Sequence, residues 1–247
     1  MIQMTGKYVF VLSSLILFVL HLSLWIQDNH AFSVKKVVIE GTHILDSAHI
    51  LSAIEVDTVN NIWNANIDNI KEELRKLPQI QDINVTRTFP SSLKIRVEER
   101  VPIALLIYNG LWGVDRNGFL LPRFRTEIGL DYPVIVGQKV NEYTTGKQVD
   151  NHTIIAIADF LSQLKGENPF VYSLISEVSM NKAMGIKIIT VDNNVPIYLG
   201  KRDLIEKCSR IGATWHYLIK EKKLAAVSYL DARYEQQIIL KHNKKEM

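Results

Sequence analysis

The chain has 247 residues, 47% of them hydrophobic, and a formal net charge of only +3. This length allows one large domain or two small ones after any targeting segment. The charge is spread evenly without a basic stripe, which argues against nucleic acid as a partner. The single cysteine, Cys208, excludes an internal disulfide, and we expect it to be buried on an apolar helical face.

An apolar segment near the N-terminus predicts a membrane anchor. Residues 8–26 contain no Asp, Glu, Lys or Arg. As a helix they would span roughly 28 Å, about the thickness of the hydrocarbon core. A cleaved signal peptide is the alternative, but residues 27–31 offer no small-x-small cleavage site. We therefore expect a short cytoplasmic segment at 1–7 and an uncleaved transmembrane helix over 8–27.

The charges beside this segment predict its orientation. Lys7 and the terminal amine precede it and Asp28 follows it, which favours a cytoplasmic N-terminus. Lys35 and Lys36 weaken that bias. The bulk of the chain is expected to lie outside the cytoplasm.

The segment after the anchor predicts a strand and two helices. The strand ends at Gly41, and Asp46 or Ser47 can cap the first helix. The apolar face of this helix is formed by Ile50, Leu51 and Ile54. The second helix begins near Asn66 and stops before Pro78, because proline cannot continue it.

Two further strands complete this first domain, which we place at residues 34–103. Apolar and polar residues alternate over 83–86 and 93–98, and the Phe-Pro-Ser-Ser run at 89–92 is typical of a tight turn. The order β-α-α-β-β predicts a small sheet with both helices over its apolar face. An unpaired edge of such a sheet can accept a strand from a partner.

The run from Leu77 to Ala104 carries a family resemblance. With V-x-x-V-x-I-x-G at residues 34–41, it reads L-P-x-I-x-x-I-x-V-x-R-x-x-P-x-x-L-x-I-x-V-x-E-R-x-P-x-A. This pattern resembles the POTRA domain of the bacterial cell-division FtsQ (DivIB) family. The matched positions include Gly41, Pro78, Arg87, Pro90, Glu99, Arg100, Pro102 and Ala104.

The remainder, residues 104–241, resembles the β domain that follows POTRA in that family. We expect a mixed, mainly antiparallel sheet with flanking helices, which makes the whole chain α+β. An Asn-Gly pair at 117–118 marks a hairpin, and helices are expected after Asn151 and from about Asp203. The other expected elements are strands at 132–137, 174–180, 185–191, 195–199, 226–231 and 234–240, and a tail at 242–247.

No residue pattern supports catalysis. The seven histidines lack metal-ligand spacing. Glu98 and Glu99 are adjacent in a strand, so they point to opposite faces and cannot flank one glycosidic bond. We expect Glu99 to form a structural ion pair with Arg100 or to cap the strand end. The sequence therefore predicts no enzymatic activity, no cofactor and no metal.

The resemblance implies a partner-binding surface in the last strands. In the family this segment binds FtsB, which adds a strand to the sheet edge. Arg233 and Tyr234 match the family's basic-aromatic pair. Arginine can hold a carboxylate bidentately, and tyrosine offers a large anchoring face. Gln236 and Ile238 are further candidates, and an ordinary edge strand is the alternative interpretation.

The function implied by the resemblance is that of a divisome scaffold. Such a protein crosses the inner membrane once at the division septum, with its POTRA and β domains in the periplasm. It binds FtsB and FtsL and helps to control septal peptidoglycan synthesis, with FtsW, FtsI and FtsK as further candidate partners. Two alternatives stay open: a POTRA protein of polypeptide export or outer-membrane assembly, and a membrane-anchored cell-wall hydrolase.

Overall fold

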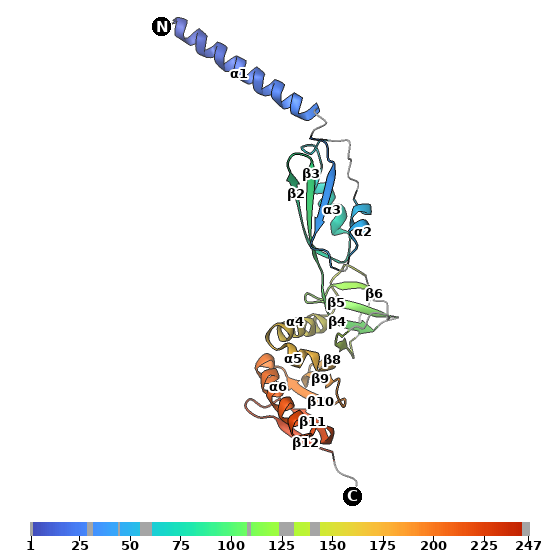
Figure 1. Ribbon diagram of the computed structural model, residues 1–247. Helices are drawn as coiled ribbons and strands as arrows, with labels where there is room; N and C mark the ends of the chain where they lie inside the picture. The colour runs from blue at the N-terminus through green and yellow to red at the C-terminus, as the bar shows by residue number, and fades with distance from the viewer. Residues whose placement is uncertain are drawn as a thin grey trace. The chain divides into compact units, whose positions relative to one another are not determined.

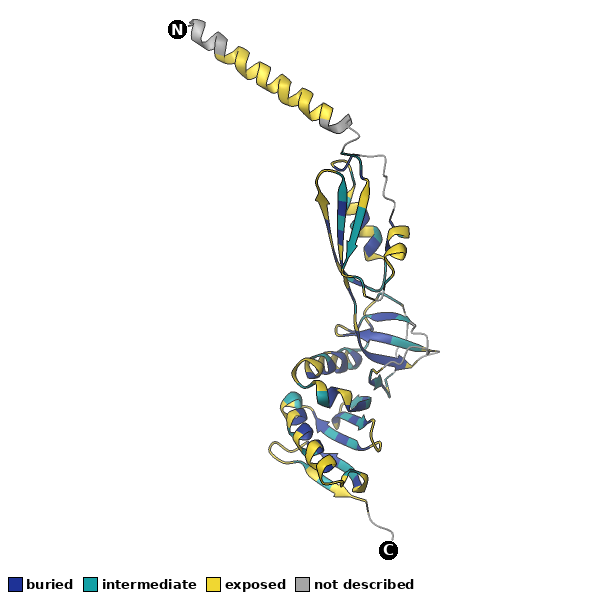
Figure 2. Ribbon diagram, viewed as in Figure 1, coloured by how far each residue is buried: buried dark blue, intermediate teal, exposed yellow. Residues whose placement is uncertain are grey.

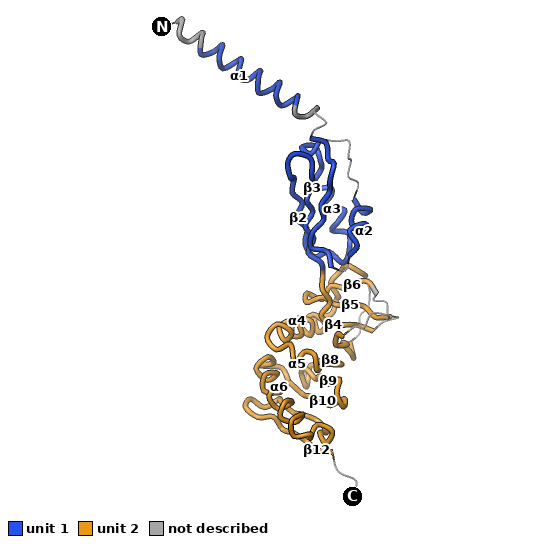
Figure 3. The backbone as a smooth tube through the Cα atoms, in the orientation of Figure 1, with its two compact units in different colours: residues 1–99 blue, residues 100–247 orange. Residues whose placement is uncertain are grey.

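The computed structural model describes residues 2–28, 32–43, 45–54, 61–107, 110–123, 131–138 and 144–243. Most of the predicted tail, from residue 244 onward, lies outside these residues. The chain divides into two compact units, Met1–Glu99 and Arg100–Met247 (Figure 3). Each unit has its own hydrophobic core.

The N-terminal helix α1 (Ile2–Asp28) contains the predicted anchor. Its segment Tyr8–Trp25 has a mean hydropathy of 2.1, and none of it is buried within the chain (Figure 2). Among the described residues this is the one helix that is long and apolar enough to cross a membrane. The segment predicted at 1–7 is helical from Ile2 onward, so it continues α1.

The remainder of the first unit has the predicted order β-α-α-β-β. Its elements are β1 (Lys36–Glu40), α2 (Ser47–Ser52), α3 (Ile67–Arg75), β2 (Ile80–Thr88) and β3 (Ser92–Glu99). The sheet order is β1-β3-β2, in which β1 runs parallel and β2 antiparallel to the central β3. Both helices lie on one face of this sheet and share its core (Figure 1).

Local capping explains where the two helices begin. The side chains of Asp46 and Asn66 each accept an amide hydrogen bond from the first turn, at 3.0 Å, which satisfies a donor that has no partner inside the helix. Ile50 and Ile54 are buried as predicted. Leu51 was predicted on the same apolar face, but it is 42% exposed, because consecutive helical positions are rotated by about 100°.

Glu99 and Arg100 have separate structural roles. The Glu99 carboxylate is buried and accepts hydrogen bonds from the amides of His43 (3.0 Å) and Leu45 (2.8 Å), so it holds a loop of its own unit. Arg100 donates to Asp115 at 2.6 Å in the second unit. Arg100 was predicted to pair with Glu99, and the ion pair that the structure gives it is with Asp115, across a β-hairpin.

The second unit is built on a nine-stranded sheet in the order β12-β11-β10-β9-β8-β7-β4-β5-β6. Its strands are β4 (Pro102–Ile107), β5 (Leu111–Asp115), β6 (Leu120–Arg123), β7 (Val134–Ile135), β8 (Ile175–Asn181), β9 (Gly185–Thr190), β10 (Pro196–Gly200), β11 (Val227–Asp231) and β12 (Ile239–His242). The pairs β4–β7, β7–β8 and β10–β11 are parallel, and the others are antiparallel. This agrees with the predicted mixed, mainly antiparallel domain.

Helices cover one face of this large sheet (Figure 1). They are α4 (His152–Glu167), α5 (Pro169–Ser173) and α6 (Leu204–Lys220), followed by the 3₁₀ turn η2 (Leu224–Ala226). Asn151 caps α4 as predicted. Cys208 and Trp215 of α6 are fully buried in the shared core, which confirms the prediction for Cys208. Burial raises the pKa of the Cys208 thiol to about 12.

The last predicted strand, 234–240, is wrong in its bounds. The chain bends at 234–236, and β12 begins only at Ile239. The reason is geometric: β12 runs antiparallel to β11, with Ile239 opposite Asp231. Residues 232–238 are therefore needed to turn the chain back toward β11.

Candidate partner-binding edge

The strand β12 forms one edge of the nine-stranded sheet, and β6 forms the other. Within the described residues, β12 has a strand partner on one side only, which is β11. It is short, and Ile239, Lys241 and His242 are exposed. A strand in this position presents backbone N–H and C=O groups to which an extended segment of another protein can pair.

Arg233 lies just after β11, and its guanidinium is held by a carboxylate of that strand. Nε donates to Oδ1 of Asp231 at 2.9 Å, and Nη2 donates to Oδ2 at 2.6 Å. The Arg233 amide also donates to Oδ1 at 3.1 Å. Bidentate pairing of this kind fixes the orientation of the arginine plane.

This pairing has an electrostatic consequence for Asp231, which is almost completely buried. The hydrogen bonds from the Arg233 side chain lower the pKa of the Asp231 carboxyl, although burial acts in the opposite direction. The carboxylate is therefore ionised at neutral pH and balances part of the charge of Arg233.

The predicted binding residues differ in how they are presented. Tyr234 is 52% exposed at the bend after Arg233. Gln236 is also exposed. Ile238 is half-buried and packs against the core of the unit. The structure thus brings Arg233 and Tyr234 together at the start of the connection to β12, whereas Ile238 stabilises its end.

A row of cations and aromatic rings that the sequence does not reveal crosses the strands beside this edge. The Tyr198 ring of β10 packs edge-on against Tyr229 of β11, with centroids 5.9 Å apart. Arg233 lies 5.6 Å and Lys187 5.9 Å from the Tyr198 ring, and Lys241 of β12 lies 5.4 Å from the Tyr229 ring. Such contacts hold the rings on the sheet face. They depend on the strand order, which no local signal specifies.

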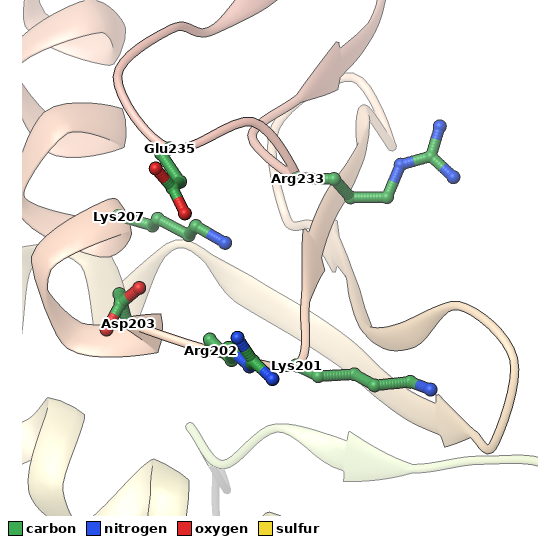
Figure 4. Close-up of a pocket in the computed structure, with 6 residues that line it drawn as sticks. All are labelled: Lys201, Arg202, Asp203, Lys207, Arg233 and Glu235. Carbon is green, nitrogen blue, oxygen red and sulfur yellow. The ribbon is translucent and has the colours of Figure 1, made fainter.

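A polar pocket of about 210 Å³ lies beside the same segment (Figure 4). Its lining residues are Lys201, Arg202, Asp203, Lys207, Arg233 and Glu235. Lys207 is almost fully buried and donates to the carbonyl of Leu199 at 3.1 Å. The Arg233 side chain extends away from Lys207 and Glu235. Charged groups of both signs line the pocket, so an apolar ligand does not fit it.

The described residues contain no candidate metal centre. Among them, no group of three or more His, Cys, Asp and Glu side chains could hold a metal ion. At this edge the Asp231 carboxylate is engaged in a structural pair with Arg233. The arrangement is suited to binding an extended polypeptide.

Comparison with protein families gives two consecutive matches. The model of the FtsQ-type POTRA domain matches residues 32–100. The model of the C-terminal part of the cell division protein FtsQ/DivIB matches residues 104–233. Together they cover residues 32–100 and 104–233, so the matches end just before the bend that leads to β12.

Individual relatives are also named as cell division proteins. "Cell division protein FtsQ" of Syntrophotalea carbinolica is 26% identical over 216 residues, which cover 87% of this chain and 76% of that protein. "Cell division protein DivIB" of Clostridium botulinum is 24% identical over 209 residues, 83% of this chain and 79% of that protein. A solved DivIB extracytoplasmic domain from Geobacillus stearothermophilus has a TM-score of 0.36 and 20% identity, and it covers 50% of this chain and 97% of that chain.

Proposed function

The chain belongs to the FtsQ/DivIB family of bacterial cell division proteins, and from this membership we propose that it is a non-enzymatic scaffold of the divisome. It binds FtsB and FtsL and helps to control septal peptidoglycan synthesis, with FtsW, FtsI and FtsK as further candidate partners. The observation that carries the proposal is the exposed edge strand β12 beside the exposed Tyr234.

In this proposal FtsB pairs with β12 as an added strand. Backbone hydrogen bonds along the edge supply affinity, and side chains beside it supply specificity. Tyr234 provides the principal anchor, because a half-exposed aromatic ring can bury a large area at a small entropic cost. Arg233 contributes its remaining N–H groups and its charge, while Gln236 and Ile238 form the outer part of the contact.

The anchor α1 tethers both units to the membrane. The N-terminus lies in the cytoplasm, and the POTRA domain (34–103) and the β domain (104–241) lie in the periplasm at the septum. Support comes from the apolar segment Tyr8–Trp25 and from the family. This arrangement limits the search for partners to proteins that reach the extracytoplasmic side of the same membrane.

The proposal is tested by co-purification of the full chain with FtsB. We expect Tyr234→Ala to weaken binding at least about tenfold, which corresponds to about 1.4 kcal/mol. Arg233→Glu should also weaken binding, because it repels acidic partner groups and leaves Asp231 without its counter-ion.

The matched control is Tyr217→Ala. Tyr217 is 54% exposed, almost the same as Tyr234, but it lies on α6. We expect this variant to bind FtsB like the wild type. Unchanged binding in both edge variants would contradict the assigned surface, and turnover of cell-wall polymer by the purified chain would contradict a non-enzymatic scaffold.

A further inference from the structure

One end of the first unit presents large aromatic side chains to solvent. Trp63 is 53% exposed and Phe89, in the β2–β3 turn, is 69% exposed. Phe89 packs against Phe32 with ring centroids 5.5 Å apart. The amide of Ile62, which precedes Trp63, donates to the carbonyl of Phe32 at 2.8 Å. These contacts join three separate stretches of chain into one surface, which we call the aromatic end (Phe32, Trp63 and Phe89).

The aromatic end rests on a fixed backbone. The Arg87 guanidinium donates to the carbonyls of Ile62 (2.8 Å), Trp63 (3.3 Å) and Ala65 (3.0 Å). A guanidinium that bonds three carbonyls holds the loop against the end of β2. The exposure of Trp63 is therefore maintained by the fold, and a large exposed ring on a fixed backbone is typical of an interaction surface.

The strand register places this surface where the chain arrives from α1. Lys36 of β1 and Thr88 of β2 both lie opposite Ser92, the first residue of β3. The helix α1 ends at Asp28, so the four peptide steps from there to Phe32 span at most about 14 Å. Phe32 is thus tethered within that distance of the end of α1, and its contacts with Phe89 and Ile62 join the rest of the aromatic end to this tether.

Basic residues lie beside the rings. Lys35 and Lys36, just before and at the start of β1, are exposed. The amide of Lys35 donates to the carbonyl of Ser91, next to the β2–β3 turn, at 2.8 Å. Exposed lysines beside exposed aromatic rings suit a bilayer interface, where aromatic rings occupy the headgroup region and cations contact lipid phosphates.

We propose that the aromatic end docks on the surface of the membrane that α1 crosses. Trp63 and Phe89 enter the headgroup region, and Lys35 and Lys36 contact anionic phosphates. The inference rests on the proposed anchorage of α1. A bilayer is favoured over a protein partner because the tether keeps the lipid surface within constant reach, which gives it a high effective concentration.

The test uses the full chain in vesicles of phosphatidylcholine and phosphatidylglycerol. An environment-sensitive fluorophore is attached at Asn64→Cys, an exposed position beside Trp63 that leaves both rings in place. The native Cys208 is fully buried with a raised thiol pKa, so it stays unlabelled. We expect blue-shifted emission and quenching by shallow spin-labelled lipids. A label at Glu98→Cys, near the far end of β3, should show neither.

Substitutions show whether the rings of the aromatic end enter the membrane or only lie near it. Trp63→Ser, alone and combined with Phe89→Ser, should reduce the quenching at position 64 at least twofold. Leu51→Ser, which removes an exposed apolar side chain of α2, should leave it unchanged. Replacing Lys35 and Lys36 with glutamine should remove the dependence of quenching on phosphatidylglycerol.

Equal quenching at positions 64 and 98, or quenching at 64 that no aromatic substitution lowers, overturns the proposal. In that case a protein partner for the aromatic end becomes the better explanation. A label at Leu17→Cys, within α1, distinguishes failure of the docking from failure of the anchorage. If deep spin-labelled lipids quench position 17 but position 64 is unaffected, only the docking fails. If position 17 is not quenched, the proposed anchorage fails as well.

Discussion

At the scale of the residue, Arg233 and Tyr234 are neighbours, but they differ in how much of the side chain a partner can contact. The guanidinium of Arg233 bonds Asp231 and lies over the Tyr198 ring. A partner carboxylate would therefore have to share it. Tyr234 has half of its surface free. For this reason we place most of the binding energy on the tyrosine, although family resemblance assigns both residues the same role.

Asp231→Asn tests the internal pair through pH. The pKa of Asp231 is lowered in the folded state, chiefly by hydrogen bonds from Arg233. The stabilisation is thus fully present above the unfolded pKa of about 3.9 and is lost as the pH falls through the folded value. At pH 7 we expect Asp231→Asn to lower the free energy of unfolding by about 1–3 kcal/mol.

The measurement is denaturant unfolding of wild type and variant from pH 7 down to pH 2. The difference between them should shrink as the pH drops below the unfolded pKa. Asp192→Asn, at an exposed position in the β9–β10 turn, is the control and should show no such trend. A difference that stays constant across the range would contradict a charge-based pair.

At the scale of the element, local signals predicted most of the first unit. Asp46, Asn66 and Pro78 mark helix ends through nearby hydrogen bonds and sterics, which sequence displays directly. The strand β4 was not predicted, because five of its six residues are buried and the alternation of apolar and polar residues is absent. The start of β12 was misplaced because the length of the return connection depends on the register with β11.

Gly41→Ala tests the close approach at the end of β1. Gly41 has φ of +87°, and an added Cβ would overlap the carbonyl oxygen of Val97 on β3. We expect a loss of at least about 1–3 kcal/mol in unfolding free energy, from backbone strain and steric overlap. The measurement is the shift in the denaturant midpoint.

Gly166→Ala provides the contrast for that substitution. Gly166 lies in α4, and an added Cβ meets nothing within 4 Å. Alanine there should stabilise the helix by up to about 1 kcal/mol. A Gly41→Ala variant as stable as wild type would show that β1 and β3 do not approach each other as described.

The proposed strand addition makes a prediction about the two edges. On binding FtsB, backbone amides of β12 (Ile239–His242) should exchange with solvent at least several-fold more slowly, because they gain hydrogen bonds or are shielded from solvent. Amides of β6 (Leu120–Arg123), the opposite edge, should exchange as before. Hydrogen exchange followed by mass spectrometry checks both segments in one experiment. Protection at β6 instead of β12 would move the binding site to the other edge.

At the scale of the whole molecule, the family match and the two cores describe an apolar N-terminal helix followed by two compact units. The sheet order of the second unit could not be read from sequence. Its parallel pairs, such as β4 with β7 and β10 with β11, join strands that are not joined by a hairpin. The row of cations and rings around Tyr198 and Tyr229 depends on that sheet order, so the sequence did not predict the row either.

The role in division is tested most directly by the location of the full chain in living cells. A functional fluorescent fusion is followed through the cell cycle, beside a marker for the start of constriction. A divisome scaffold that binds FtsB and FtsL should gather at midcell before constriction begins. A fusion that supports growth but stays evenly distributed around the membrane would contradict the account.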